Sequence, residues 1–155
     1  MWGAVVSDHY LSVIPADPKF VPDAVSRSEA LRLFTEMVGR ADEIKLKLTE
    51  HIQFIDQGEN AECVLCPYCG DNLGEWWYGA MDRAWASRFE NLAAAVPCCG
   101  REASLNDLRY EWPAGFARFV LRARNAAIGG YIQADQASEL ERALGCTIRQ
   151  VLTMY

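Results

Sequence analysis

Two short stretches decide how this chain can fold: Cys66-Pro67-Tyr68-Cys69-Gly70 and, further along, Pro97-Cys98-Cys99-Gly100. Each is a cysteine-bearing turn followed by glycine, the residue that most readily adopts the positive φ such a turn needs. Two turns of this kind can close one tetrahedral site, with backbone N–H groups directed at the sulfur atoms. We therefore expect Cys66, Cys69, Cys98 and Cys99 to bind one metal ion.

The donor set favours zinc as the cofactor. Four thiolates suit a divalent ion that has no geometric preference of its own. A site with four protein ligands has no open position, so we expect a structural ion and no catalytic residue. Cys63 is a reserve ligand, because Cys63, Cys66 and Cys69 stand three residues apart and could supply three ligands, with Cys98 or Cys99 as the fourth. Cys146 is expected to pack in a core.

A redox role is the alternative for the first turn. Cys66-Pro67-Tyr68-Cys69 resembles the active-site motif of the glutaredoxins, which implies a thiol–disulfide oxidoreductase with a reactive thiolate at a helix start. Val96-Pro97 is similar to the Val-Pro of that family. However, the interval between Cys69 and Val96 is too short for the elements of that fold, and Gly70 with residues 71–74 indicates a turn instead of a helix.

Two further resemblances concern the Cys-rich part. Residues 66–70 resemble the first knuckle of the zinc ribbons, whereas the adjacent Cys98 and Cys99 depart from the second. The succession of Pro97-Cys98-Cys99-Gly100, Ser104-Leu105-Asn106-Asp107-Leu108 and Trp112-Pro113-Ala114-Gly115-Phe116-Ala117-Arg118-Phe119 resembles uncharacterised bacterial proteins of the actinobacterial type. That resemblance covers mainly residues 60–125. It implies a bacterial cytoplasmic protein and brings no assigned activity.

Hydrophobic periodicity predicts four strands and two helices outside the Cys-rich part. The expected strands are 10–14, 43–54 with a break near Glu50, 117–124 and 147–155. A helix is expected over 26–38, begun by a capping box at Ser26 and Glu29, and another over 137–144, closed by Gly145. This order is the split β-α-β arrangement of ferredoxin-like α+β folds, with both helices on one face of an antiparallel sheet.

The Cys-rich part interrupts this arrangement. We expect a discontinuous ferredoxin-like domain of residues 1–57 and 114–155, with a zinc-ribbon-like insertion at 58–113. One aromatic-rich helix is expected in the insertion, because Trp77, Met81, Trp85, Phe89 and Leu92 recur at helical spacing. Residues 104–112 are expected to form a solvated, polar connection.

Charge and composition limit the classes of binding partner and the cellular locations that we expect for this chain. The chain has 155 residues and a formal net charge of −6, which disfavours nonspecific binding to nucleic acid or anionic membranes. Residues 1–8 lack a basic segment followed by an apolar run, and no stretch approaches about 18 apolar residues. We expect a cytoplasmic protein with no membrane partner.

The expected function is non-enzymatic. His9 and His51 lie far from both Cys-bearing turns in sequence, so a three-ligand catalytic zinc site is not predicted. We expect a protein-interaction, adaptor or immunity role, with an acidic surface that favours a basic protein partner. Nucleic-acid binding is the alternative, because Arg118, Arg122 and Arg124 share one face of a predicted strand.

Overall fold

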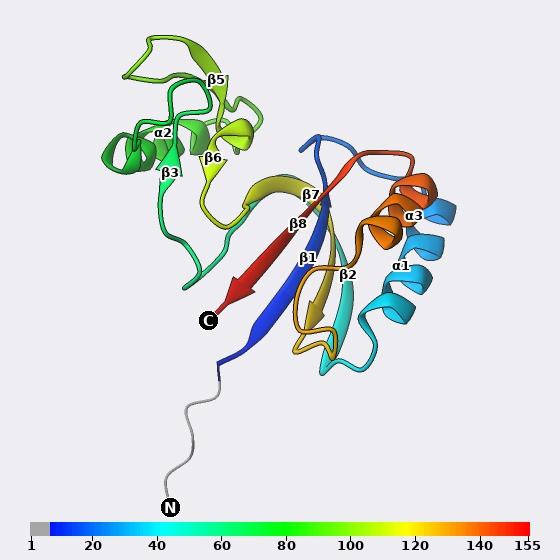
Figure 1. Ribbon diagram of the computed structural model, residues 1–155. Coiled ribbons are helices and arrows are strands. Elements are labelled where there is room, and N and C mark those ends of the chain that lie inside the picture. The colour runs from blue at the N-terminus through cyan, green and yellow to red at the C-terminus, as the bar shows by residue number, and fades with distance from the viewer. Residues whose placement is uncertain (1–6) are drawn as a thin grey trace, which may run out of the picture.

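The computed structural model describes residues 7–155 as mixed α+β structure (Figure 1). Residues 1–6, on which the expected lack of a targeting segment partly rests, lie outside the described residues. The helices are α1 (Ala24–Val38), α2 (Gly74–Trp85) and α3 (Ala134–Leu144), with a 3₁₀ turn, η1, at Leu105–Asp107. The strands are β1 (His9–Pro15), β2 (Glu43–Ile55), β3 (Val64–Leu65), β4 (Ala93–Ala95), β5 (Glu102–Ser104), β6 (Arg109–Tyr110), β7 (Gly115–Arg124) and β8 (Ile148–Met154).

The four longest strands form one antiparallel sheet in the order β2-β7-β1-β8. β1 pairs with both β7 and β8, and β2 pairs with β7. The four strands expected from alternation are therefore confirmed, as is the α+β class. Alternation predicts these strands because successive side chains point to opposite faces of a strand. When one face is buried, apolar residues therefore recur at every second position.

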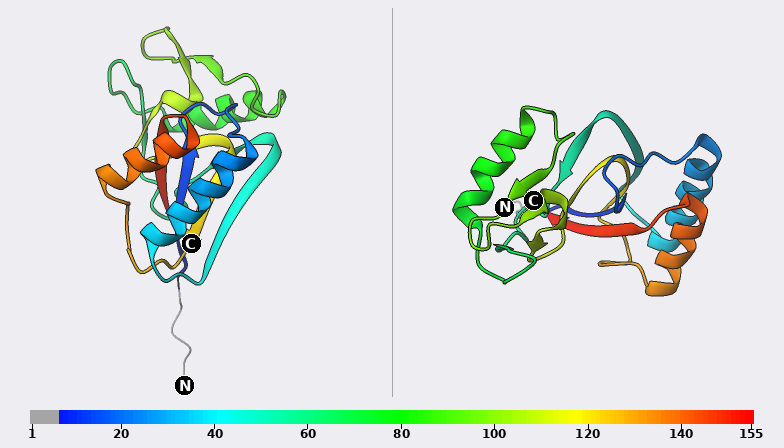
Figure 2. Two further views of the ribbon diagram at one scale, coloured as in Figure 1. Left: turned by 90° about the vertical axis from the view of Figure 1, so that its right-hand side faces the viewer. Right: turned by 90° about the horizontal axis from the view of Figure 1, so that it is seen from above.

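Helices α1 and α3 cover one face of this sheet (Figure 2). Leu11, Val13, Phe119 and Leu121 from the sheet pack there with residues of both helices such as Phe34 and Leu140, all buried.

The predicted capping box at the start of α1 is wrong. Asp23 is the N-cap, and its carboxylate accepts a hydrogen bond from the Ser26 backbone N–H at 2.8 Å, because a carboxylate placed ahead of the first turn satisfies a free amide there.

Strand β2 contains the expected irregularity. Leu48 pairs with Phe119 and Gln53 with Ala117, so residues 49–52 face the single residue Arg118. A bulge of this kind bends a strand and redirects its side chains. Here the bulge delivers Ile52, which has no exposed surface, into a second core beyond the end of the helix-covered sheet.

That second core belongs to the segment between β2 and β7, residues 58–113, called the lobe. It contains α2 and two small sheets, β3 with β6 and β4 with β5. Figure 2 shows it on the side of the main sheet opposite the helices. The core combines lobe residues such as Leu73, Val96 and Leu105 with Ile52 and Phe116 of the main sheet. The domain boundaries at 57/58 and 113/114 stay a prediction, since packing crosses both.

The helical stripe expected in the lobe is only partly correct. Helix α2 ends at Trp85, whose side chain is 49% exposed, and Arg88 and Phe89 have positive φ. The reversal of the chain at these two residues returns Phe89 and Leu92 to the lobe core, where both are buried. Phe89 and Leu92 are thus buried in the same core as α2 although they follow the end of the helix. Periodicity alone does not distinguish this turn from a longer helix.

The connection at 104–112 is not a solvated loop, contrary to expectation. Asn106 is 5% exposed, and its side-chain amide donates to the Ala16 carbonyl at 2.8 Å. Arg149 of β8 donates through Nη1 to the carbonyls of Asn106 at 2.8 Å and Ala114 at 2.9 Å. Asn106 can be buried because its polar groups find partners on distant segments, and these hydrogen bonds connect the lobe to the main sheet.

Within residues 7–155, none of the helices combines the length and the apolar composition needed to cross a lipid bilayer.

The bulge residue provides a test of this architecture. Ile52→Ala should lower the free energy of unfolding by about 2–5 kcal/mol, because it removes a fully buried side chain from the lobe core. Leu48→Ala, on the same strand but 45% exposed, should cost about 0.5 kcal/mol or less. Urea unfolding followed by tryptophan fluorescence measures both. Equal destabilisation by the two variants would contradict the assignment of Ile52 to the lobe core.

Candidate metal centre

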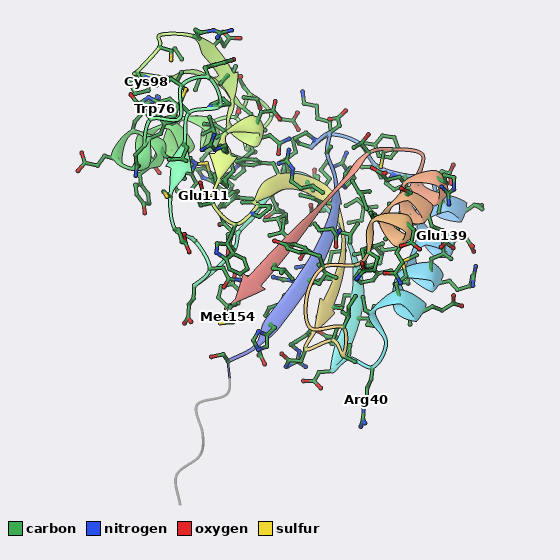
Figure 3. The ribbon with its side chains drawn as sticks, viewed as in Figure 1. Arg40, Trp76, Cys98, Glu111, Glu139 and Met154 are labelled. Carbon is green, nitrogen blue, oxygen red and sulfur yellow. The ribbon has the colours of Figure 1, made fainter. Side chains whose placement is uncertain are left out.

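Four thiols meet at the outer end of the lobe. The Sγ atoms of Cys66, Cys69, Cys98 and Cys99 all lie within 4.8 Å of one another, and those of Cys69 and Cys98 are 3.4 Å apart. Figure 3 shows Cys98 at the end of the lobe, far from Arg40 and Glu139 on the helical side. Four sulfurs at metal–sulfur distances of about 2.3 Å in a tetrahedron would be about 3.8 Å apart. The cluster therefore has the chemistry and the spacing to hold a metal ion.

The two Cys-bearing turns are built by the same hydrogen bonds. In the first, the Gly70 N–H donates to the Cys66 carbonyl at 3.0 Å and the Cys66 N–H donates to the Asp71 carbonyl at 2.8 Å. In the second, the Gly100 N–H donates to the Val96 carbonyl at 2.8 Å and the Val96 N–H donates to the Arg101 carbonyl at 2.9 Å. Gly70 and Gly100 both have positive φ, at 81° and 67°. Residues 66–71 and 96–101 are thus equivalent turns.

This equivalence explains the adjacent cysteines of the second turn. Val96 occupies the position of Cys66, and both side chains are completely buried. Cys99 corresponds to Cys69, while Cys98 stands where the first turn has Tyr68. The second turn therefore offers its two thiols from its third and fourth positions instead of its first and fourth. Sequence reasoning missed this, although alignment of Pro67 with Pro97 and of Gly70 with Gly100 carries the signal.

Tyr68 links the two turns. Its hydroxyl donates to the carbonyl of Glu102, which begins β5 directly after the second turn, at 2.6 Å. The Arg101 guanidinium lies 3.8 Å from the centre of the Tyr68 ring, within the range of a cation–π contact. A residue at the third position of one turn thereby fastens the other turn, which keeps the four thiols together.

The thiols influence one another's ionisation. Burial raises the pKa of Cys66, but hydrogen bonds from the backbone N–H groups of Cys69 and Tyr68 and from the thiols of Cys98 and Cys69 outweigh it, and the pKa is lowered to about 7. Burial, together with the neighbouring thiols of Cys69, Cys66 and Cys99, raises the pKa of Cys98 to about 12. The cluster thus favours the thiolate of Cys66 and disfavours that of Cys98, and a bound cation would stabilise both charged forms.

The remaining candidate residues lie elsewhere. Cys63, the reserve ligand, is half-buried just before β3 and is not among the thiols that the structure gathers. Cys146 is half-buried against the helix-covered core, where burial raises its pKa to about 11. His9 and His51 are exposed on β1 and β2. Among the described residues, the cluster suited to a metal contains cysteines alone.

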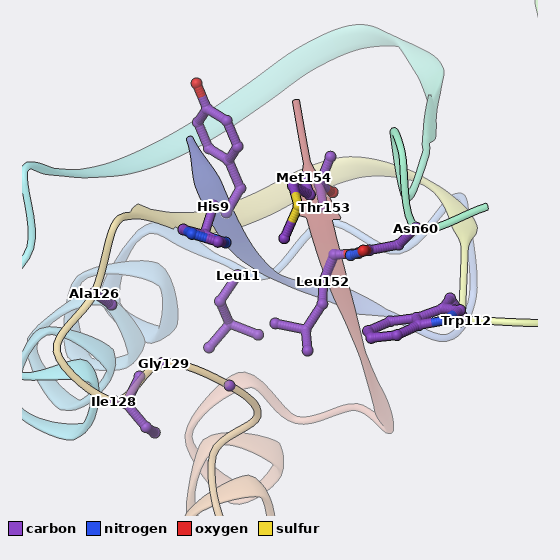
Figure 4. A pocket seen from close by; sticks show the side chains of 12 residues that line it. His9, Leu11, Asn60, Trp112, Ala126, Ile128, Gly129, Leu152, Thr153 and Met154 are labelled. Carbon is purple, nitrogen blue, oxygen red and sulfur yellow. The ribbon is translucent and has the colours of Figure 1, made fainter. Parts of the chain in front are cut away.

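A cavity of about 210 Å³ beside β1 and β8 is separate from this centre (Figure 4). Leu11, Ile128, Leu152 and Trp112 make much of its wall, and His9 and Asn60 add polar groups. None of its lining residues is a cysteine. The Asn60 amide already donates to the Leu152 carbonyl at 3.2 Å, so the cavity offers little polar chemistry beyond the exposed His9.

Comparisons with protein-family models, with curated proteins and with solved structures find no match to this chain. The resemblance to bacterial proteins of the actinobacterial type stays a prediction.

The equivalence of the turns predicts a ligand exchange. Cys98→Ser should abolish tetrahedral tetrathiolate absorption of the Co²⁺-loaded protein, because one of four sulfurs is lost. Adding Val96→Cys to that variant should restore it, since Val96 occupies the position from which Cys66 reaches the cluster. Val64→Cys with Cys98→Ser is the control and should not restore it. Failure of Val96→Cys to rescue the spectrum would contradict the equivalence.

Proposed function

We propose that this protein is a non-enzymatic binding protein whose four-cysteine centre holds a structural Zn²⁺ ion. The observation that carries the proposal is the meeting of Cys66, Cys69, Cys98 and Cys99 within 4.8 Å. Thiolates are soft donors that favour zinc over magnesium or calcium, and four of them complete a tetrahedron without a position for water. When bound, the ion would neutralise the gathered thiolates and cross-link the two turns.

The residues around the thiols favour a structural site. Cys66 is completely buried, and the Tyr68 N–H lies 3.4 Å from its sulfur as a hydrogen-bond donor. The positive φ of Gly70 and Gly100 allows the backbone of each turn to reverse directly after its cysteines. The chain itself thus orients the ligands, and the two- and three-residue strands of the lobe are too short to be stable without such support.

The finer fold assignment is also a proposal. We assign β1, α1, β2, β7, α3 and β8 to the ferredoxin-like class, supported by the strand order β2-β7-β1-β8 and by the two helices on one face. The lobe would be a zinc-ribbon-like insertion, supported by its two equivalent turns. Its second turn departs from the ribbon pattern. The first position of that turn is Val96, which has no thiol, and Cys98 at the third position supplies the thiol instead.

A thiol–disulfide oxidoreductase is less well supported. A reactive cysteine of that class is exposed at a helix start, where the helix lowers its pKa. Cys66 is buried, and α2 begins only at Gly74, after a turn and a bridge between Leu65 and Asn72. The pKa of Cys66 is lowered by hydrogen bonds from the backbone of its own turn and from the Cys98 and Cys69 thiols, and a low pKa equally suits a metal ligand.

A protein partner is supported by the outer surface of α2. Tyr78 and Trp85 are 68% and 49% exposed, and Arg88 lies 4.4 Å from the Trp85 ring centre. Exposed aromatic side chains bordered by charge are typical of protein interfaces. The net charge of −6 favours a basic partner. An adaptor or immunity role, and a cytoplasmic location, remain parts of this hypothesis.

Metal analysis tests the structural centre. Protein purified without chelators should contain about one equivalent of zinc, because a single tetrathiolate site is present in the described residues. Cys69→Ser and Cys99→Ser should lose most of it, whereas Cys63→Ser and Cys146→Ser should keep it. Less than about a tenth of an equivalent in the unchanged protein, or equal loss in the Cys63→Ser variant, would contradict the proposed centre.

The partner surface is tested separately. Immobilised, zinc-loaded protein should capture a partner from an extract of its source cells, and Trp85→Ala with Tyr78→Ala should reduce that capture at least about tenfold, as expected of interface aromatics. Val25→Ala removes an apolar side chain that is 81% exposed on α1 and serves as the control. Equal capture by the α2 variant and the control would exclude this surface.

A further inference from the structure

The face of the main sheet that the helices leave uncovered holds an unusual group of polar atoms. This open face carries Tyr10 and Ser12 of β1, Lys45 and Lys47 of β2, and Arg122 and Arg124 of β7. In the described part of the chain, three buried side-chain nitrogen or oxygen atoms lack a hydrogen-bond partner: Ser12 Oγ, Arg122 Nε and Arg124 Nε. All three lie on the open face.

These atoms come together through strand register. Ser12 pairs directly with Arg122, and Tyr10 pairs with Arg124, across the β1–β7 ladder. Ser12 has no exposed surface. A buried hydroxyl or guanidinium N–H without a partner costs free energy, and native structures usually supply a water, an ion or a ligand at such a place.

A cavity adjoins the group. It has a volume of about 220 Å³, and Ser12, Arg122 and Lys47 supply donors to it from three different strands. Phe54 and Ile55, from the part of β2 beyond the bulge, and Tyr155 form other parts of its wall. The bulge that carries Ile52 into the lobe core therefore also shapes this cavity.

The charges of the cavity favour an anion. Among the described residues, Arg122 and Lys47 have no carboxylate within ion-pair distance, whereas Lys45 pairs with Glu43 at 3.4 Å and Arg124 lies 3.9 Å from Asp8. The one acidic residue in the lining is Asp56.

Asp56 is already engaged by other groups. Its Oδ1 accepts hydrogen bonds from the Gly58 N–H at 2.8 Å and from the Tyr155 hydroxyl at 2.9 Å. The lining thus carries two cations without an ion-pair partner and one carboxylate that is hydrogen-bonded to other groups, in a chain whose net charge is −6.

We propose that this cavity is a binding site for a phosphate group, with Arg122, Lys47 and the Ser12 hydroxyl as its donors. A tetrahedral oxyanion can accept from three donors that converge from separate strands. The Arg122 guanidinium is positioned in advance, because it lies 4.3 Å from the centre of the Tyr10 ring. Tyr155, 52% exposed at the rim, offers a ring on which a base can stack, so the class of ligand extends from free phosphate to nucleotides.

Titration of the zinc-loaded protein with inorganic phosphate and with uridine 5′-monophosphate tests the site. In ¹⁵N-resolved NMR spectra, the Arg122 Nε–H and the Ser12 amide should shift saturably. Arg122→Gln and Lys47→Gln should each weaken binding about tenfold or more, as expected for loss of a charge-assisted hydrogen bond. Tighter binding of the nucleotide identifies a nucleotide ligand, and equal binding identifies phosphate alone.

Two further variants separate binding from folding. Ser12→Ala should weaken phosphate binding without lowering the thermal stability of the free protein, because the hydroxyl it removes has no partner. Lys19→Gln removes a cation outside the cavity, and this variant should bind phosphate as the unchanged protein does. Absence of saturable shifts, or equal weakening by Lys47→Gln and Lys19→Gln, would overturn the proposal.

Discussion

The convergence of four thiols on one point is the constraint on which the lobe depends. Cys66 and Cys69 come from one turn and Cys98 and Cys99 from another, and the chain between them contains α2 and β4. Burial and the neighbouring thiols disfavour the ionised form of Cys98, whose pKa is raised. A bound cation reverses that effect, since it stabilises the thiolates and closes a long loop at the same time.

The lobe is continuous with the main sheet in its packing. Ile52 and Phe116 share a core with lobe residues, and Asn106 and Arg149 form hydrogen bonds between the two parts. Restraint of the lobe by a metal ion would therefore extend to the end of the sheet. Phe54 packs against the lobe core and also lines the cavity of the open face, so the proposed metal centre and the proposed phosphate site share a structural support.

Charge is unevenly distributed over this acidic chain. Arg32 on α1 is paired with Glu29 and Glu36, which neutralise it, whereas Arg122 and Lys47 have no such partner among the described residues. A net charge of −6 opposes nonspecific attraction of polyanions, yet two unpaired cations beside a buried hydroxyl can still select a single oxyanion. Overall charge and local recognition are therefore separate properties of this molecule.

The sequence by itself determined the main strands, both sheet-packed helices and the two Cys-bearing turns, while it left Cys63 as an alternative ligand that the tertiary structure keeps out of the cluster. Strand alternation, helical spacing and Cys-turn-Gly patterns all express contacts or backbone conformations within a few residues, which is why they can be read locally. Only the tertiary structure decided that Val96 replaces a ligand, that α2 stops at Trp85, and that Arg149 bonds to Asn106. It alone also left Ser12 without a partner. Hydrogen-bond satisfaction between distant segments depends on how those segments pack, and no periodicity in the chain records it.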